Sequence, residues 1–297
     1  MLAETIHSLA DVCNQFLLYV GIKHGSSSQP TKMYPFGKGQ ARYVWNLISA
    51  IGIFFVGFGV TTYHGLSQLI SPGDHQTDDP LVLILVLVFA FVVEGYSLLV
   101  AVGSVRELKD DRSFFEFVRH GDDPTTIGVL FEDGIAVLGV VVALVGIILS
   151  HYTGSHVPDA IASILIGFLL GIMAVVLAIL NGRILMGVSA GADLETEIRE
   201  FVESDEKVER VTSIKTAVLA PGRLRLSLEV EFHGGILIDR EVINRDAEKI
   251  RDGEDPAYIL FETSERMVRL VGRTINQLEA KIHKEFPEVV LIDLEVN

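Results

Sequence analysis

The stretch LVLILVLVFAFVV (81–93) runs for thirteen apolar residues without a charge. A membrane-spanning helix needs about 20 mostly apolar residues, and this run lies within a longer apolar segment, 81–105. Four more segments qualify as predicted spans: 2–22, 43–70, 125–150 and 157–185. The first of them, 2–22, is the weakest because polar residues occupy its first half. The sequence therefore predicts an integral membrane protein that begins with an all-α bundle of five hydrophobic helices.

The composition changes near residue 187. Apolar residues make up 49% of the chain and the mean hydropathy is +0.42, and nearly all of the apolar excess precedes that point. We therefore expect a transmembrane transport domain over 1–187 and a soluble C-terminal domain over 188–297. The net charge of −15 argues against a nucleic-acid partner, which requires a basic face. The single Cys13 excludes a disulfide framework and a cysteine-based zinc cluster.

Lysine and arginine occupy alternate loops between the predicted spans. Loops 23–42 and 106–124 each hold four basic residues, whereas loops 71–80 and 151–157 hold none. The positive-inside rule places the two basic loops and the C-terminal domain in the cytoplasm. Met1 then lies on the far side, so we expect a further spanning helix to precede it.

The C-terminal part alternates between helical and extended patterns. Its predicted elements are a helix over 192–204, strands over 210–219 and 223–232, helices over 239–252 and 256–285, and a strand over 289–296. This order predicts a small open sheet with helices on one face, a ferredoxin-like α/β domain.

Two polar residues explain the weakness of the first span. His7 and Asp11 are four positions apart, so they share one face of a helix. An imidazole and a carboxylate so placed can ligate one borderline cation such as zinc. Asn14 extends this polar face by another turn. The alternative is a polar helix packed against protein, with His7 hydrogen-bonded to Asp11.

The fourth span carries two adjacent acidic residues, Glu132 and Asp133. On a helix the two point about 100° apart, so we expect only one of them to enter a given site. If Asp133 faces the bundle, it can complete a metal site with His7 and Asp11, and Glu132 becomes a neighbour of that site or an alternate ligand. The alternative is that both lie near the cytoplasmic end of the span, in contact with water.

Glu94 follows the apolar run of the third span and falls near the middle of the membrane. A carboxylate at that depth is costly unless it serves an ion or a proton path or pairs with another polar group. A proton-relay or ion-site role and a pairing with a neighbouring helix both remain open.

Several of these segments resemble the cation diffusion facilitators. AETIHSLADVCNQ (3–15) is similar to the second transmembrane helix of that family, with its HxxxD metal pair. YPFGKGQARY (34–43) resembles the loop that follows it, and VPDAIASILIGFLLG (157–171) resembles the start of the sixth helix. The branch containing zinc transporter 9 is the most similar, through YHGLSQLI (63–70) and LFEDGIAVLGV (130–140). The resemblance covers essentially the whole chain.

The resemblance implies a central metal site. His7 and Asp11 would be its first ligand pair, and Asp133 matches the aspartate of the second pair. The other member of the second pair is usually a histidine or aspartate four residues earlier, where this sequence has Val129. This departure leaves three standard ligands instead of four.

A fourth ligand must then come from elsewhere, and Glu132, Asn14, Glu94 or a water molecule are the candidates. The departure leaves zinc specificity open, so manganese, iron, cobalt and nickel remain alternatives. The metal is the transported substrate, and we expect no cofactor. Six spans, a cytoplasmic N-terminus and a homodimer formed through the soluble domain are further implications of the resemblance. We match no regulatory zinc ligands in the soluble domain and expect that site to be absent.

These patterns together predict a divalent-cation transporter, with zinc favoured, that exchanges metal for protons by alternating access. An imidazole, with an ordinary pKa of about 6.5, can exchange a proton for a metal ion near neutral pH. A non-transporting membrane metal sensor or scaffold with a degenerate site is the alternative. No nucleophile, phosphate loop or hydrolytic zinc motif is found, so we do not expect an enzyme. The predicted location is a prokaryotic plasma membrane, with a mitochondrial membrane as the alternative and the soluble domain on the cytoplasmic or matrix side.

Overall fold

The computed structural model of the chain describes residues 2–25, 31–70, 80–108, 113 and 124–297. The chain divides into two compact units, Met1–Met186 and Gly187–Asn297. The predicted loops 71–80 and 106–124 lie mostly outside the described residues.

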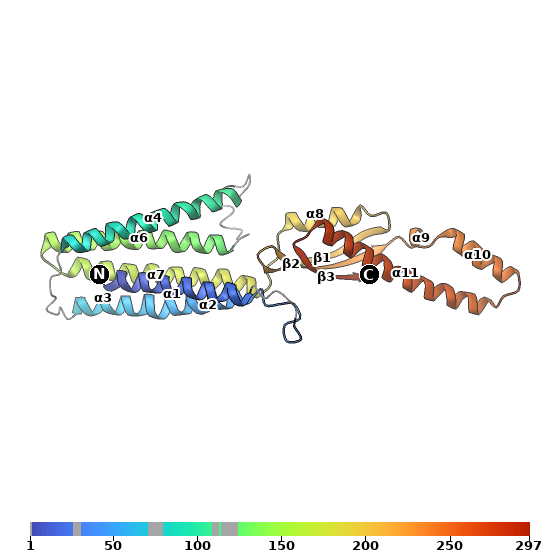
Figure 1. The fold of residues 1–297 in the computed structure, drawn as a ribbon, viewed down its shortest axis with the longest axis horizontal. Helices are drawn as coiled ribbons and strands as arrows, with labels where there is room; N and C mark the ends of the chain where they lie inside the picture. Colours follow the sequence, from blue (N-terminus) through green and yellow to red (C-terminus); the bar gives the residue numbers. More distant parts are fainter. Residues whose placement is uncertain (1, 26–30, 71–79, 109–112, 114–123) are drawn as a thin grey trace. The chain divides into compact units, whose positions relative to one another are not determined.

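The first unit is a bundle of long helices, drawn from blue to yellow-green in Figure 1. Its elements are α1 (Leu2–Gly25), α2 (Ala41–Gly52), the π-helical segment η1 (Ile53–Val60), α3 (Thr61–Ile70), α4 (Pro80–Leu108), α6 (Pro124–Thr153) and α7 (Val157–Leu185). Within the part of the chain that the structure describes, four helices are long and apolar enough to cross a membrane: Ala41–Ile70, Leu81–Glu107, Thr126–Thr153 and Val157–Leu185. The first of these joins α2, η1 and α3 in one continuous span. The predicted class, a multi-pass membrane bundle, is confirmed.

Helix α1 is not among those four spans, although it is 24 residues long. Its first half carries the polar residues of the predicted site, which lower its hydropathy. It packs against α2 and also contacts α6 and α7. The weakest predicted span is thus a helix of the bundle whose polar face meets other helices.

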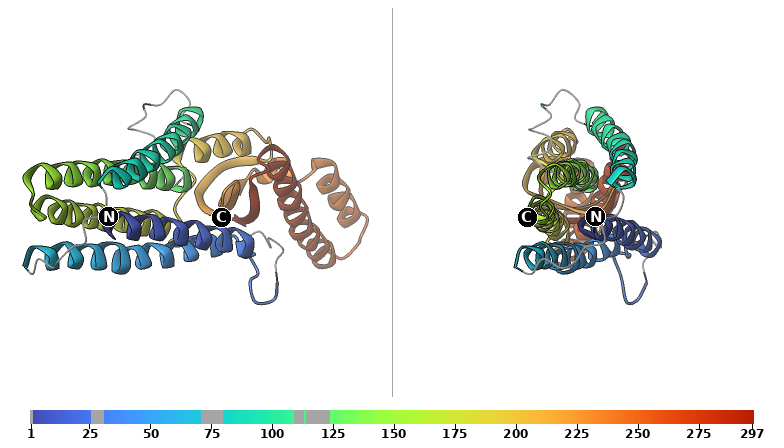
Figure 2. Two further views of the ribbon diagram at one scale, coloured as in Figure 1. Left: turned by 60° about the vertical axis from the view of Figure 1, so that its left-hand side comes forward. Right: turned by 90° about the vertical axis from the view of Figure 1, so that its left-hand side faces the viewer.

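Helix α7 lies at the centre of this unit, in contact with α1, α2, η1, α3 and α6, and α4 packs on α6 (Figure 2). Its residues Leu170 and Met173 are fully buried in the bundle core. Glycines bring α3 close to it. A Cβ added to Gly65 would lie 2.7 Å from Ile164 Cγ1, and one added to Gly167 would overlap Thr62 Oγ1. Small residues allow such close approach between membrane helices.

The second unit is a small α/β domain. Its elements are α8 (Ala192–Glu203), β1 (Val208–Ala220), β2 (Arg223–Phe232), α9 (Gly234–Leu237), α10 (Arg240–Arg251), α11 (Pro256–Glu285) and β3 (Val289–Val296). The sheet order is β1-β2-β3, with β1 and β2 antiparallel and β2 and β3 parallel. Every element predicted for this part of the chain is present, and the short helix α9 is additional. The order α-β-β-α-β matches the ferredoxin-like pattern without its first strand among the described residues.

The core of this domain lies on one face of the sheet. Alternate residues of β2 are buried, as the strictly alternating sequence predicts: Leu224, Leu226, Leu228 and Val230. The helices α8 and α11 cover this face with Ile198, Val202, Leu278 and Ile282, which belong to the same cluster. The predicted placement of helices on one face of the sheet therefore agrees with the structure.

Helix α10 and the first half of α11 form a hairpin that extends beyond the sheet (Figure 1). Asp246 of α10 accepts hydrogen bonds from Thr263 Oγ1 (2.8 Å) and Arg266 Nη1 (3.0 Å) of α11. Large apolar side chains of α11 remain exposed along this hairpin, and Phe261 and Val268 are 63% and 74% exposed. The hairpin thus presents apolar surface away from the domain core.

Candidate metal site

The polar face of α1 contributes two described side chains to the bundle interior. Asp11 is partly buried, and Asn14, almost one turn further along, is buried. The backbone of His7 belongs to the same helix, but its side chain lies outside the described residues. The pairing of His7 with Asp11 therefore stays a prediction.

Both acidic residues of α6 are buried. Glu132 is 6% exposed and Asp133 is 8% exposed, so the alternative of two water-solvated carboxylates at the end of the helix is wrong. A buried carboxylate needs hydrogen bonds or opposite charge to offset the loss of water. Each of the two receives a hydrogen bond, and the donors come from different helices.

Glu132 of α6 accepts its hydrogen bond from α1. Asn14 Nδ2 donates to Glu132 Oε1 at 2.6 Å, and Ser49 Oγ of α2 donates to Asn14 Oδ1 at 2.6 Å. The amide of Asn14 is thereby fixed, with its nitrogen toward the carboxylate and its oxygen toward the hydroxyl. Both polar atoms of the Asn14 amide are therefore engaged in these hydrogen bonds.

Asp133 accepts its hydrogen bond from α4 instead. Ser97 Oγ donates to Asp133 Oδ2 at 2.8 Å. Glu94 precedes Ser97 by three positions, so both lie on the same side of α4. The two carboxylates of α6 thus turn toward different helices, as their angular separation predicts. Ser97 and Ser49 are not among the predicted site residues, although a polar residue inside an apolar span is the signal that identifies such positions.

Four carboxylates from three helices share one region of the bundle. The charge of Asp11 interacts with those of Glu94 and Asp133, and the charge of Glu132 interacts with all three. Glu94 lies fourteen residues into α4, which corresponds to about 21 Å along a helix and to the interior of a core roughly 30 Å thick.

The spans supply no lysine or arginine to this region. Their lysine and arginine residues all lie within three positions of a helix end: Lys23, Arg42, Arg106 and Arg183. The interior of the bundle therefore carries a formal excess of negative charge. Protons or a metal cation can neutralise such an excess.

The described carboxylates are not gathered into a closed coordination shell. Among the described residues, no three histidine, cysteine, aspartate or glutamate side chains lie close enough to hold one metal ion. Val129 occupies the position where a fourth ligand was sought, and it contributes an apolar wall beside Glu132. A complete site would need the side chain of His7 or a closer approach of α1, α4 and α6.

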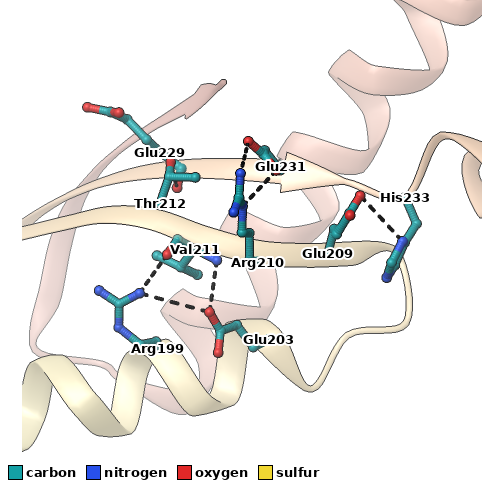
Figure 3. Close-up of polar contacts among 9 residues, drawn as sticks. All are labelled: Arg199, Glu203, Glu209, Arg210, Val211, Thr212, Glu229, Glu231 and His233. Carbon is teal, nitrogen blue, oxygen red and sulfur yellow. Dashed lines mark hydrogen bonds and ion pairs between the residues drawn. The ribbon is translucent and has the colours of Figure 1, made fainter.

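Figure 3 shows polar contacts around β1 and β2 of the C-terminal domain, including those of Arg199 and Glu203 of α8 with the backbone of Val211. Arg210 on β1 and Glu231 on β2 form a two-pronged ion pair at 2.8 Å, and the hydrogen bond from Arg210 lowers the pKa of Glu231 below its ordinary value. His233 Nδ1 lies 3.6 Å from Glu209 Oε2, and both side chains are about half exposed.

Comparison with known proteins identifies the same family. The profile of the cation efflux transmembrane domain matches residues 1–186. The chain is 32% identical over 305 residues to the mouse and human proteins named proton-coupled zinc antiporter SLC30A9, mitochondrial. It is 30% identical over 309 residues to metal tolerance protein C4 of Arabidopsis thaliana.

The matches extend over 100% of this chain but over 53% of the mouse and human relatives and 67% of the plant relative. The chain thus spans about half the length of the animal proteins. The family profile covers more than half of the chain and the full-length similarity agrees with it. The chain therefore belongs to the cation efflux family, the cation diffusion facilitators that its sequence resembles.

Proposed function

We propose that this chain moves divalent metal cations, with zinc as the favoured substrate, across a membrane in exchange for protons. The observation that supports this proposal most strongly is the excess of buried carboxylates within the spans. Asp11, Glu94, Glu132 and Asp133 come from three helices, and no lysine or arginine lies deep in those helices. A site of this kind is stable only when it holds cations.

Metal and protons are natural competitors for such a site. Carboxylates bind a metal ion only when ionised, so metal binding releases protons and proton binding releases metal. Two relatives are named as proton-coupled zinc antiporters, which supports the same exchange here. By alternating access, the site would open first to one side of the membrane and then to the other.

The choice of metal depends on the donor atoms. The described donors are carboxylate oxygens, which suit manganese and other harder cations as well as zinc. The imidazole of His7 would shift the preference toward zinc. Manganese, iron, cobalt and nickel are the alternative substrates, and competition against zinc flux ranks them.

A membrane metal sensor that does not transport is the second candidate. Its support is the substitution of Val129 in the second ligand pair and the open arrangement of the described carboxylates. Equilibrium binding of zinc to the purified chain, without flux into liposomes, would favour that candidate.

The topology and assembly belong to the same proposal. The basic residues at the ends of α1, α2, α4 and α7 support a cytoplasmic or matrix location for the soluble domain. The exposed apolar side chains of the α10–α11 hairpin support a homodimer formed through that domain.

Zinc flux into proteoliposomes tests the proposal. The full chain should accumulate zinc when an opposing proton gradient is imposed, and Asp11→Asn should abolish that flux. Asp159→Asn is the matched control, because Asp159 lies in the first turn of α7, outside the carboxylate cluster. Undiminished flux through Asp11→Asn would refute the site, and absence of flux in the unmodified chain would refute transport.

A further inference from the structure

A small polar cavity lies beside the carboxylate cluster. It measures about 30 Å³, and four helices wall it with Asn14, Asn46, Glu132 and Asn181. Asn14, Glu132 and Asn181 are each more than nine-tenths buried. Leu18 and Leu177 complete its apolar side. None of the metal-site expectations includes Asn46 or Asn181.

Hydrogen bonds fix the orientation of the amide pair in this cavity. Asn181 Nδ2 donates to the carbonyl oxygen of Leu177 at 2.8 Å, and a carbonyl can only accept. Asn181 Oδ1 is therefore free to accept, and it receives Asn46 Nδ2 at 3.1 Å. The side-chain oxygen of Asn46, Oδ1, takes part in neither of these hydrogen bonds. It is buried, and no hydrogen-bond donor reaches it among the described residues.

The opposite wall also presents oxygen. Asn14 turns its nitrogen toward Glu132 Oε1 and its oxygen toward Ser49, so the carboxylate of Glu132 is the acceptor that remains on this side. The cavity is thus lined by an amide oxygen without a donor and by a buried carboxylate. A lining of this kind fits a cation or another group that donates, and it repels anions.

The cavity lies between Asp11 and the helix ends that carry basic residues. Asn181 is four residues before the end of α7, and Asn46 is five residues after the start of α2. These separations correspond to about 6 and 7.5 Å along a helix. Asp11 is fourteen residues from the same end of the bundle on α1. An ion entering from the basic-loop side would meet the cavity before Asp11.

We propose that this cavity is a second cation station, in which Glu132 and the side-chain oxygen of Asn46 hold an incoming divalent metal ion before it reaches the Asp11–Asp133 region. The inference rests on the proposed transport function and adds Asn46 and Asn181 to it. Asn181 positions the amide of Asn46, and Asn14 positions the carboxylate of Glu132.

The size and donors of the station define its ligand. A cavity of about 30 Å³ has room for about two water molecules, so a metal ion cannot enter with its full hydration shell and must shed water. Magnesium dehydrates reluctantly and is disfavoured. Oxygen-only donors hold manganese and zinc without strong preference between them, so the station selects for charge and ease of dehydration.

Binding of Mn²⁺ to the full chain, read by electron paramagnetic resonance, tests the station apart from transport. In an Asp11→Asn/Asp133→Asn background, one Mn²⁺ should still bind, and a large excess of Mg²⁺ should not displace it. Adding Asn46→Leu, which keeps the branching of the side chain and removes the oxygen, should weaken that binding about tenfold or more. Glu132→Gln, nearly isosteric, should weaken it at least as much.

Gln15→Leu is the control, because Gln15 adjoins Asn14 in sequence but is exposed on the outer side of α1. Equal Mn²⁺ affinity in the Asn46→Leu and Gln15→Leu backgrounds, or no bound Mn²⁺ in the double-aspartate background, overturns the station. If Asn46→Leu fails to fold, the Mn²⁺ affinity of Glu132→Gln in the same background tests the station by itself, and an unchanged affinity overturns it. These readouts need no flux, so a chain that binds Mn²⁺ in this way but moves no zinc would overturn the proposed transport and leave the station standing.

Discussion

Asn14 and Glu132 are 118 positions apart in the sequence and are joined by a hydrogen bond of 2.6 Å within the helical bundle. The bond links α1 to α6, and Ser49 extends it to α2. A buried carboxylate is therefore oriented by a side chain from the helix that also carries Asp11. Movements of α1 relative to α6 must change the surroundings of both acidic residues together.

Removing the amide of Asn14 should destabilise the bundle. In Asn14→Leu the buried carboxylate of Glu132 loses its donor, which costs about 2 kcal/mol when the partner is charged. We expect a lower midpoint of thermal unfolding, followed by helical circular dichroism of the purified chain. Gln15→Leu makes the same chemical change on an exposed position and should leave the midpoint near that of the unmodified chain. Equal midpoints for the two variants would contradict the role of Asn14.

Ser97→Ala should weaken metal binding without unfolding the protein. Ser97 Oγ orients Asp133, and loss of a group that orients a metal ligand typically lowers affinity about 10- to 100-fold. The measurement is the zinc concentration that gives half-maximal flux. Ser104→Ala is the control, since Ser104 bonds only to the carbonyl of Val100 on its own helix. An unchanged half-maximal concentration in Ser97→Ala would show that Asp133 is oriented by other contacts.

Gly65→Ala should be costly because α3 and α7 leave no room for a methyl group. The added Cβ would lie 2.7 Å from Ile164 Cγ1 and 2.8 Å from the backbone oxygen of Ala160. Overpacking of this kind costs about 2 kcal/mol, and thermal unfolding measures it. Gly182→Ala has no atom within 4 Å of the new Cβ and should be neutral or slightly stabilising. Equal effects of the two substitutions would contradict the close packing of α3 on α7.

The α10–α11 hairpin should loosen in acid. The pKa of Asp246 lies below its ordinary value, because the hydrogen bond from Thr263 and the contact with Arg266 outweigh the opposing effect of burial. A lowered pKa means that the folded state favours the ionised carboxylate. This contribution is complete above the ordinary aspartate value of about 3.9 and disappears as the pH falls through the lower folded value.

Hydrogen exchange of α10 in the full chain measures this effect. At neutral pH, Asp246→Asn should exchange faster than the unmodified chain, and the difference should vanish at a pH below the folded pKa of Asp246. Asp293→Asn, which breaks an exposed pair with Arg225 on the sheet, should leave α10 unchanged. A difference that persists unchanged into strong acid would refute the ionised contact.

A charge on the exposed face of α11 should break the proposed homodimer. Phe261 and Leu260 are 63% and 64% exposed, and burial of such side chains between two copies would be lost in Phe261→Glu. The expected result is a monomer by size-exclusion light scattering in detergent. Gln277→Glu adds a charge to the same helix outside the hairpin and should stay dimeric. A Phe261→Glu variant that remains a dimer would move the interface elsewhere.

Much of the architecture could be predicted because it depends on local patterns. The apolar spans follow from composition, and the alternation of Arg223 to Phe232 predicts β2 to the residue. The helical pattern over 256–285 predicts α11 (Pro256–Glu285), and Asp255 Oδ1 caps this helix by accepting from the backbone nitrogen of Ala257. Such signals are contained in a few neighbouring residues, so one sequence is sufficient to interpret them.

Other features depend on contacts between distant segments and escaped prediction. The sequence marks Glu132 and Asp133 as candidates, but only the packing of α6 between α1 and α4 decides that each receives a different donor. The pair Asn46–Asn181 spans 135 positions, and neither residue belongs to a motif. The π-helical segment Ile53–Val60 inside the second span likewise has no signal in the apolar pattern.

Simultaneous recording of zinc and proton flux in liposomes tests the central claim most directly. With the full chain, an inward zinc gradient should drive zinc in and protons out, and an imposed proton gradient alone should drive zinc against its own gradient. Both fluxes should disappear together in Asp11→Asn and persist in Asp159→Asn. Zinc entry with no accompanying proton movement, or equal exchange through Asp11→Asn, would contradict the exchange of metal for protons at the buried carboxylates.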